Sequence, residues 1–299
     1  MLTISFTNQK YFSISHLVSL ISVIFSFFAP ETYQNVIACL GILSFGILHG
    51  ANDLKIIGKN NWKFKSNYRI FPFVLYIGVV VLGIAVFYFI PGVALLSFVL
   101  VSCYHFGEQH WEGRLKHRKG VQLFYFSYGA FIFLMLFTLQ YKDTAEVIFQ
   151  ITSLQLPLIF FQISLLIVSL VLFVQFIIQV GFNSELVSEI LLIGLLAILF
   201  YKGTLLFGFG LYFVVWHSFP SLRSQVHYIY GTLDRKSFIH YFKSALLYWV
   251  MSLLGLFGAY FFLDIPSDQY LPLFFSFLAA ITFPHAIVME RMFSIPPIE

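Results

Sequence analysis

Charged residues are scarce in this chain. Only 10% of its 299 residues are charged, against about 25% in an ordinary soluble domain. Hydrophobic residues make up 60% and form long uncharged runs, which leaves no room for a sizeable soluble domain. This composition predicts a polytopic membrane protein, and we expect residues 1–299 to form a single integral membrane domain.

Cysteine is also rare, and the net charge is small. Cys39 and Cys103 both lie inside apolar runs, so they predict no disulfide framework. The formal net charge of +4 comes from basic residues in short loops between the apolar runs. This charge therefore does not indicate a nucleic-acid-binding surface. The first apolar run is followed by no small-residue cleavage site, so we expect a membrane span there rather than a signal peptide.

The apolar runs predict an all-α transmembrane bundle. A spanning helix needs about 20 mainly apolar residues, and charged residues, proline and glycine separate about ten such runs. The count falls to eight if the first run and the short seventh run do not cross the membrane. The expected spans are residues 14–29, 35–57, 70–90, 92–112, 121–140, 156–180, 187–201, 203–222, 244–263 and 270–292.

Basic residues cluster in alternate loops of this ten-span arrangement. The loops after the second, fourth and eighth spans, together with the two ends of the chain, carry most of the lysines and arginines. Among the basic residues, the opposite side has only Lys142 and Lys202. By the positive-inside rule, both termini are predicted to be cytoplasmic.

Four histidines lie at similar positions in even-numbered spans. Each is about 12–15 residues into its span, or roughly 18–23 Å along the helix. Even-numbered spans run in the same direction, so we expect the four imidazoles to share one depth, toward the cytoplasmic leaflet. A single membrane histidine is more often a hydrogen-bond partner of another helix, but four at one depth favour a metal site. They are His49, His105, His217 and His285.

Acidic residues follow two of these histidines at helical spacing. Asp53 is one turn beyond His49, and Glu108 stands three residues after His105. Each could orient a metal ligand by hydrogen bonding. Asp53 could equally cap a helix or lie in the headgroup region near Lys55.

Three other protein classes also place histidines in membrane helices. A transporter or metal permease uses intramembrane ionisable residues along an ion pathway, but its site usually lies at the midplane. A membrane di-iron desaturase or hydroxylase has clustered histidine boxes. This chain has only one tight pair of histidines, His105 and His110. A b-type haem protein would need two facing histidines in a four-helix core.

Four motifs, in order over nearly the whole chain, resemble the Brp/Blh family of bacterial and archaeal membrane β-carotene 15,15′-dioxygenases. They are His49-Gly50-x-x-Asp53, Tyr104-His105-Phe106-Gly107, Trp216-His217-Ser218 and Pro284-His285. The resemblance implies an enzyme of the cell membrane that uses O₂ to cleave the central double bond of β-carotene into two molecules of all-trans-retinal. A retinal-binding rhodopsin is the product acceptor that the family suggests.

The resemblance also implies a cofactor, non-haem Fe(II). The family's ligands match His49, His105 and His217, and Asp53 matches an acidic position of the family motif. Family members carry a further histidine where this chain has Ser221. The fourth ligand is therefore His285 or, as the alternative, His110, unless three residues and water hold the iron.

Overall fold

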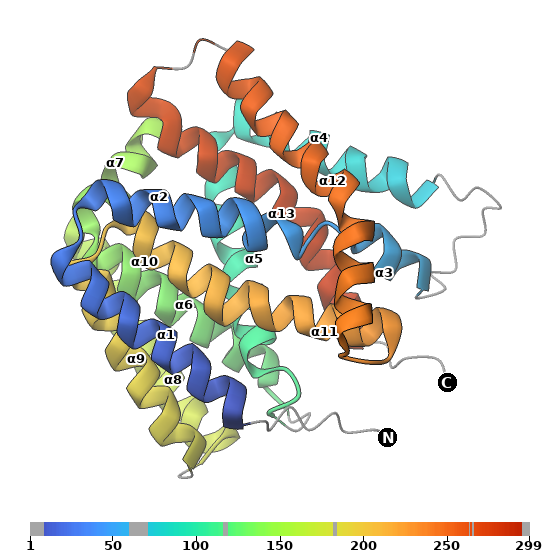
Figure 1. Cartoon of the computed structure of the whole chain (residues 1–299). Coiled ribbons are helices and arrows are strands. Elements are labelled where there is room, and N and C mark those ends of the chain that lie inside the picture. The colour runs from blue at the N-terminus through green and yellow to red at the C-terminus, as the bar shows by residue number, and fades with distance from the viewer. Residues whose placement is uncertain are drawn as a thin grey trace. The chain divides into compact units, whose positions relative to one another are not determined.

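Every regular element that the structure describes is a helix. The computed structural model describes residues 9–59, 71–115, 119–181, 184–262, 264 and 266–294 (Figure 1). The all-α prediction is confirmed for these residues. The elements, in order, are α1 (Gln9–Phe28), α2 (Glu31–Gly41), η1 (Ile42–Gly46), α3 (Asp53–Lys59), α4 (Phe71–Phe89), α5 (Pro91–Trp111), α6 (Val121–Leu139), α7 (Tyr141–Thr152), α8 (Leu158–Gln179), α9 (Ser184–Lys202), α10 (Leu205–Leu211), η2 (Tyr212–Ser218), α11 (Phe219–Tyr230), α12 (Arg235–Phe262), η3 (Ser267–Gln269) and α13 (Tyr270–Ser294).

Seven helical stretches in the described ranges are long and apolar enough to cross a membrane. They mark the chain as a membrane protein by length and composition. A shorter apolar stretch, Ile14–Phe28, lies within α1. The ten-span count and the cytoplasmic position of both termini stay predictions. The seven stretches are Phe71–Phe89, Pro91–Trp111, Val121–Leu139, Leu158–Gln179, Leu205–Tyr230, Arg235–Phe262 and Tyr270–Ser294.

The second expected span is not one continuous helix. The sequence predicts a helix over residues 35–57, but α2 passes into the π-helical segment η1, and residues 49–52 form turns before α3 begins at Asp53. The Asn52 amide donates to the backbone carbonyl of Tyr241 on α12 at 3.0 Å, which holds the turn in place. An apolar pattern does not reveal such a long-range bond. The apolar pattern also did not predict α7, an additional helix between the fifth and sixth expected spans.

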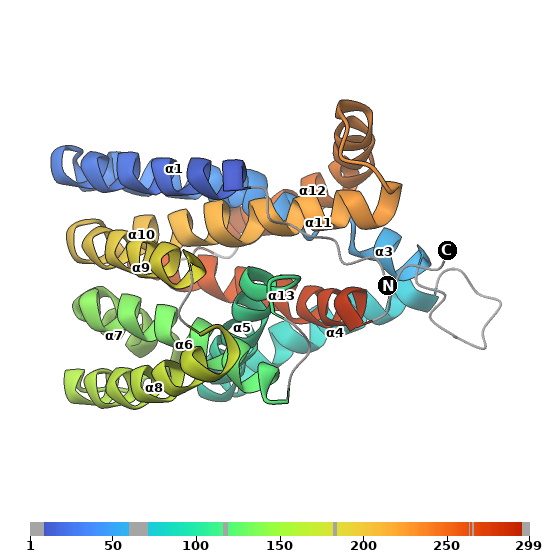
Figure 2. The same ribbon diagram turned by 90° about the horizontal axis from the view of Figure 1, so that it is seen from below.

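The chain divides into two compact units. The first comprises residues 1–42, 103–146 and 155–220, and the second comprises residues 43–102, 147–154 and 221–299. Within the first unit, α1 packs against α9, α2 against α10 and α6 against α8. Within the second, α4 packs along α13, and α3 contacts both of these helices (Figure 2). The single membrane domain stays a prediction.

Thr204 fixes the start of α10, the helix that leads into η2. Its side-chain oxygen accepts a hydrogen bond from the backbone N–H of Phe207 at 3.1 Å, a typical N-cap. The Thr204 hydroxyl donates to Asn35 at 2.6 Å, and its backbone N–H donates to the side-chain oxygen of Gln34 at 3.1 Å. Both partners lie in α2, so these bonds join two helix beginnings within the first unit.

Two glycines let α5 and α6 approach closely in the first unit. A Cβ atom added to Gly107 of α5 would overlap the backbone carbonyl of Tyr125 on α6. A Cβ atom added to Gly129 of α6 would overlap the backbone carbonyl of Cys103 on α5. Small residues permit this backbone contact between membrane helices. The reciprocal pair thereby fixes the segment of α5 that carries His105.

We expect Gly107→Ala and Gly129→Ala each to lower the unfolding free energy by at least about 2 kcal/mol, because each added methyl must push the two backbones apart. Thermal unfolding of the detergent-solubilised chain measures the change. Gly194→Ala is the matched control, since a Cβ atom at Gly194 of α9 meets nothing within 4 Å. Equal midpoints for all three variants would show that the close contact between α5 and α6 does not exist.

Candidate functional site

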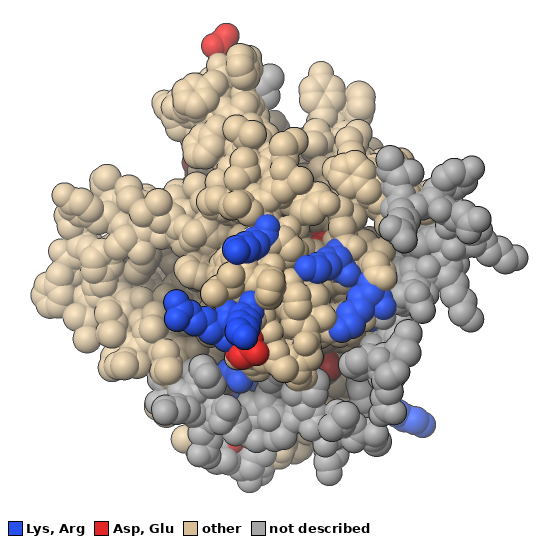
Figure 3. Space-filling view, turned by 45° about the vertical axis from the view of Figure 1, so that its right-hand side comes forward, with Lys and Arg blue, Asp and Glu red and all other residues tan. Residues whose placement is uncertain are grey.

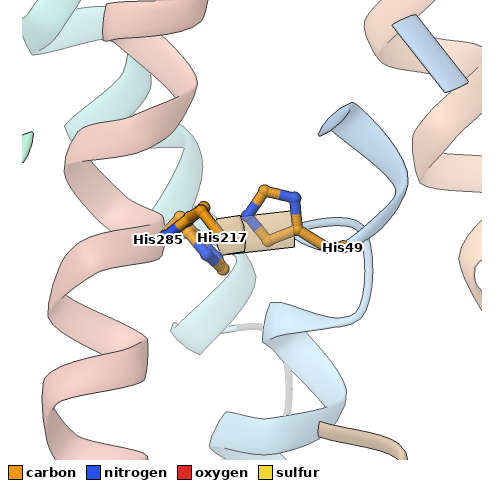
Figure 4. A group of neighbouring side chains, drawn as sticks. All are labelled: His49, His217 and His285. Atoms are coloured by element: carbon orange, nitrogen blue, oxygen red, sulfur yellow. The ribbon is translucent and has the colours of Figure 1, made fainter. Parts of the chain in front are cut away.

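His49 and His285 form a pair in the second unit. His49 lies in the turn after η1, and His285 follows Pro284 on α13 (Figure 4). Their rings meet edge to face with centroids 4.7 Å apart, and both side chains are buried. The structure thus brings together two predicted ligands from distant parts of the sequence.

Asp53 orients one member of this pair. Its carboxylate oxygens lie 2.9 and 3.1 Å from Nδ1 of His285, and the hydroxyl of Tyr76 donates to the same carboxylate at 3.0 Å. With Nδ1–H donating to Asp53, Nε2 of His285 is the nitrogen that can bind a metal. The sequence associated Asp53 with His49 by helical spacing, whereas in the structure Asp53 bonds to His285.

His105 and His217 form a second pair, in the first unit. His105 lies on α5 and His217 in η2, and their ring centroids are 4.7 Å apart at 78°. Both side chains are buried. The ring of Phe106 stacks on His217 with centroids 4.0 Å apart, which limits rotation of that imidazole. The second pair therefore also consists of predicted ligands held in contact.

Both π-helical segments of the described chain adjoin a site histidine. The segment η1 ends at Gly46, shortly before His49, and η2 contains His217. An inserted residue in a helix turns the following side chains, and such π-bulges are frequent at functional sites. Apolar periodicity does not distinguish a π-turn from an α-turn, so the sequence offered no signal for either segment.

His110 belongs to a different cluster of the first unit. Its Nε2 lies 3.2 Å from both carboxylate oxygens of Glu189 on α9 and 3.1 Å from the hydroxyl of Tyr128. Tyr128 and Arg114 donate to Glu189 at 2.8 and 2.9 Å. The buried carboxylate is thus balanced by the guanidinium of Arg114. His110 therefore has different neighbours from His105, whose ring lies against that of His217.

The sequence did not single out Glu189. The only available signal was an acidic residue inside the short apolar run at residues 187–201. Glu108, a candidate support for His105, accepts a hydrogen bond from the hydroxyl of Tyr104 at 3.2 Å. Ser221, where a further histidine was expected from the family, is buried and is hydrogen-bonded to the Gln225 side chain at 3.1 Å.

Comparison with known proteins supports the interpretation of the motifs. A family model described as beta-carotene 15,15′-dioxygenase matches residues 40–293, which is most of the chain. No curated protein and no solved structure among those compared matches it. The matched range includes all four histidines and Asp53, and it confirms the resemblance inferred from their motifs. The chain therefore belongs to the β-carotene 15,15′-dioxygenase family.

Proposed function

We propose that this protein is a membrane dioxygenase that cleaves the central double bond of β-carotene with O₂, giving two molecules of all-trans-retinal. The observation that carries the proposal is the burial and pairing of the four family-motif histidines. All four are buried, and they lie in two ring-to-ring pairs within their units. Membership of the family supplies the substrate class.

The proposed cofactor is non-haem Fe(II), and the donor set fits it. Imidazole is a common ligand of iron, and buried uncharged rings carry a smaller desolvation cost than charged side chains. His49, His217 and His285 each offer one ring nitrogen (Figure 4). We assign these three and His105 as the ligands. His110 is not assigned, because Glu189 and Tyr128 bond to its Nε2.

The chain's own residues would fix the directions of these rings. Asp53 holds Nδ1 of His285 and thereby selects its tautomer, while Tyr76 holds the carboxylate. Phe106 covers one face of the His217 ring. When bound, Fe(II) would supply the activation of O₂, and protein groups would contribute mainly by positioning the reactants.

The substrate suits an apolar, buried site. A carotenoid is a hydrocarbon that dissolves in the bilayer, so it can approach between membrane helices without crossing water. One O₂ and one central C=C bond yield two aldehydes that carry one oxygen atom each. The reaction therefore balances without an external reductant.

We further propose that the protein lies in the cell membrane with both termini cytoplasmic and the histidines toward the cytoplasmic leaflet. In the second unit, the Lys55 and Lys59 side chains reach the end of α11, where they donate to the Tyr230 hydroxyl and to the carbonyls of Tyr228 and Ile229. The face drawn in Figure 3 carries several Lys and Arg side chains. Such a basic face favours the cytoplasmic side. A retinal-binding rhodopsin remains the proposed product acceptor.

Expression in β-carotene-producing cells tests the reaction. We expect the orange pigment to disappear and retinal to accumulate, because the substrate is available in the same bilayer. Pigment extraction followed by chromatography measures both compounds. Unchanged carotene in aerobic, iron-replete cells whose membranes contain the folded protein would disprove the proposed activity.

The four assigned ligands can be tested singly. His49→Ala, His105→Ala, His217→Ala and His285→Ala should each abolish retinal formation and lower the iron content of the purified chain, because each removes a donor nitrogen. His240→Ala, on the exposed surface of α12, is the control and should change neither quantity.

His110→Ala gives a contrasting result in the same experiment. It should lower the unfolding midpoint, because Glu189 loses a buried partner, but it should leave iron content per folded molecule unchanged. Any assigned histidine whose alanine variant keeps full iron content and activity is not a ligand.

Asp53→Asn should weaken metal binding by about 10- to 100-fold, because an amide neither carries the charge nor fixes the His285 tautomer as a carboxylate does. Titration of the apo-protein with Co(II), followed by visible absorption, measures the affinity. Asp143→Asn, at an exposed position of α7, is the matched control. An Asp53→Asn affinity equal to that of the control would remove Asp53 from the support of the site.

A further inference from the structure

The hydroxyl of Tyr241 lies against the backbone of a proposed ligand. Tyr241 is a fully buried residue of α12, with a relative exposure of 0%. Its phenol oxygen is 2.9 Å from the backbone carbonyl oxygen of His49 and 2.7 Å from the side-chain oxygen of Gln225. His49, Gln225 and Tyr241 all belong to the second unit. A side chain from α12 thus reaches the backbone of the turn that carries His49.

The direction of these bonds follows from counting hydrogens. The phenol has one hydrogen, and the backbone carbonyl of His49 can only accept. The orientation of a glutamine amide is an assignment, and turning Gln225 by 180° lets its NH₂ group donate to the phenol oxygen. Ser221 can then donate to the Gln225 oxygen. In this arrangement each polar group has a suitable partner, and the phenol hydrogen points to His49.

A second bond ties the same turn to the same residue. The Asn52 side-chain NH₂ donates to the backbone carbonyl of Tyr241 at 3.0 Å, and the Ser244 hydroxyl donates to the Asn52 side-chain oxygen at 2.8 Å. Residues 49–52 form turns rather than a regular helix. Their two ends are therefore fixed by Tyr241, one through its hydroxyl and the other through its carbonyl.

Apolar packing surrounds this hydrogen-bonded group. Tyr241 forms a buried cluster with Leu48, Leu222, Val226 and Ala245, all within the second unit. Water has little access there, so breaking the phenol–carbonyl bond leaves a buried acceptor unsatisfied. The bond is consequently maintained, and it restricts the position of the His49 backbone.

We propose that Tyr241 is a positioning residue for the metal ligand His49. The inference rests on the proposed function, in which His49 binds the metal. By holding the carbonyl of His49, the phenol fixes the backbone from which the imidazole projects. Tyr241 acts through the backbone of His49, whereas Asp53 acts on the ring of His285 directly.

The test compares Co(II) binding by the full-length, detergent-solubilised apo-protein and its variants. Tyr241→Phe keeps the ring and removes only the hydroxyl. We expect its Co(II) affinity to fall by about tenfold or more, with an altered visible absorption spectrum, since outer groups that orient ligands have effects of this size. Tyr248→Phe is the matched control, because Tyr248 lies on the same helix and is 38% exposed. Its affinity and spectrum should equal those of the wild type.

His49→Ala separates this inference from the proposed function. If His49→Ala binds Co(II) as the wild type does, His49 is not a ligand, and both proposals fail. If His49→Ala loses Co(II) while Tyr241→Phe binds it normally, only the positioning role fails. Should Tyr241→Phe not fold, Asn52→Ala removes the other bond between Tyr241 and the turn that carries His49, and a loss of Co(II) affinity is again expected. Normal Co(II) binding by Asn52→Ala would then overturn the positioning of this turn by Tyr241.

Discussion

Polar side chains inside apolar helices must find partners, and this requirement organises each unit. A buried carboxylate is costly unless charge and hydrogen bonds compensate it. Asp53 is bonded by His285 and Tyr76, and Glu189 is bonded by Arg114 and Tyr128. These partners come from distant parts of the sequence. Within each unit, satisfying these few buried polar groups therefore determines which helices pack together, because the rest of each helix is largely apolar.

Irregular backbone is concentrated where the histidines lie. The segments η1 and η2 are π-helical, and the turn at residues 49–52 interrupts the second expected span. In an apolar environment such breaks persist only when side chains satisfy the backbone groups that leave the helix. At the turn, the Tyr241 hydroxyl does this for the carbonyl of His49, and the Asn52 side chain ties the turn to the backbone of α12. The regular helices thus supply the framework, and the local irregularities direct the histidines.

The sequence predicted what depends on residue type and local pattern, and it missed what depends on distant partners. The expected span at residues 92–112 differs from α5 by one residue at each end, because a long apolar run bounded by proline and charge is a local signal. The four histidines were identifiable because imidazole is unusual in hydrocarbon. The turn at residues 49–52 could not be predicted from the sequence, because it depends on hydrogen bonds to the distant residue Tyr241. Likewise, helical spacing suggested His49 as the neighbour of Asp53, whereas the tertiary fold supplies His285.

The two histidines of the second unit are held by different means. Asp53 fixes His285 through a ring nitrogen, which affects its tautomer and its direction together. Tyr241 donates to the backbone carbonyl of His49, so it acts on the direction from which the imidazole projects. Because both supports are buried and lie within one unit, the pair can be oriented before any metal binds. In the proposed function, such preorganisation would lower the entropy lost on metal binding, and it would account for the tyrosine, the asparagine and the aspartate that lie around these two imidazoles.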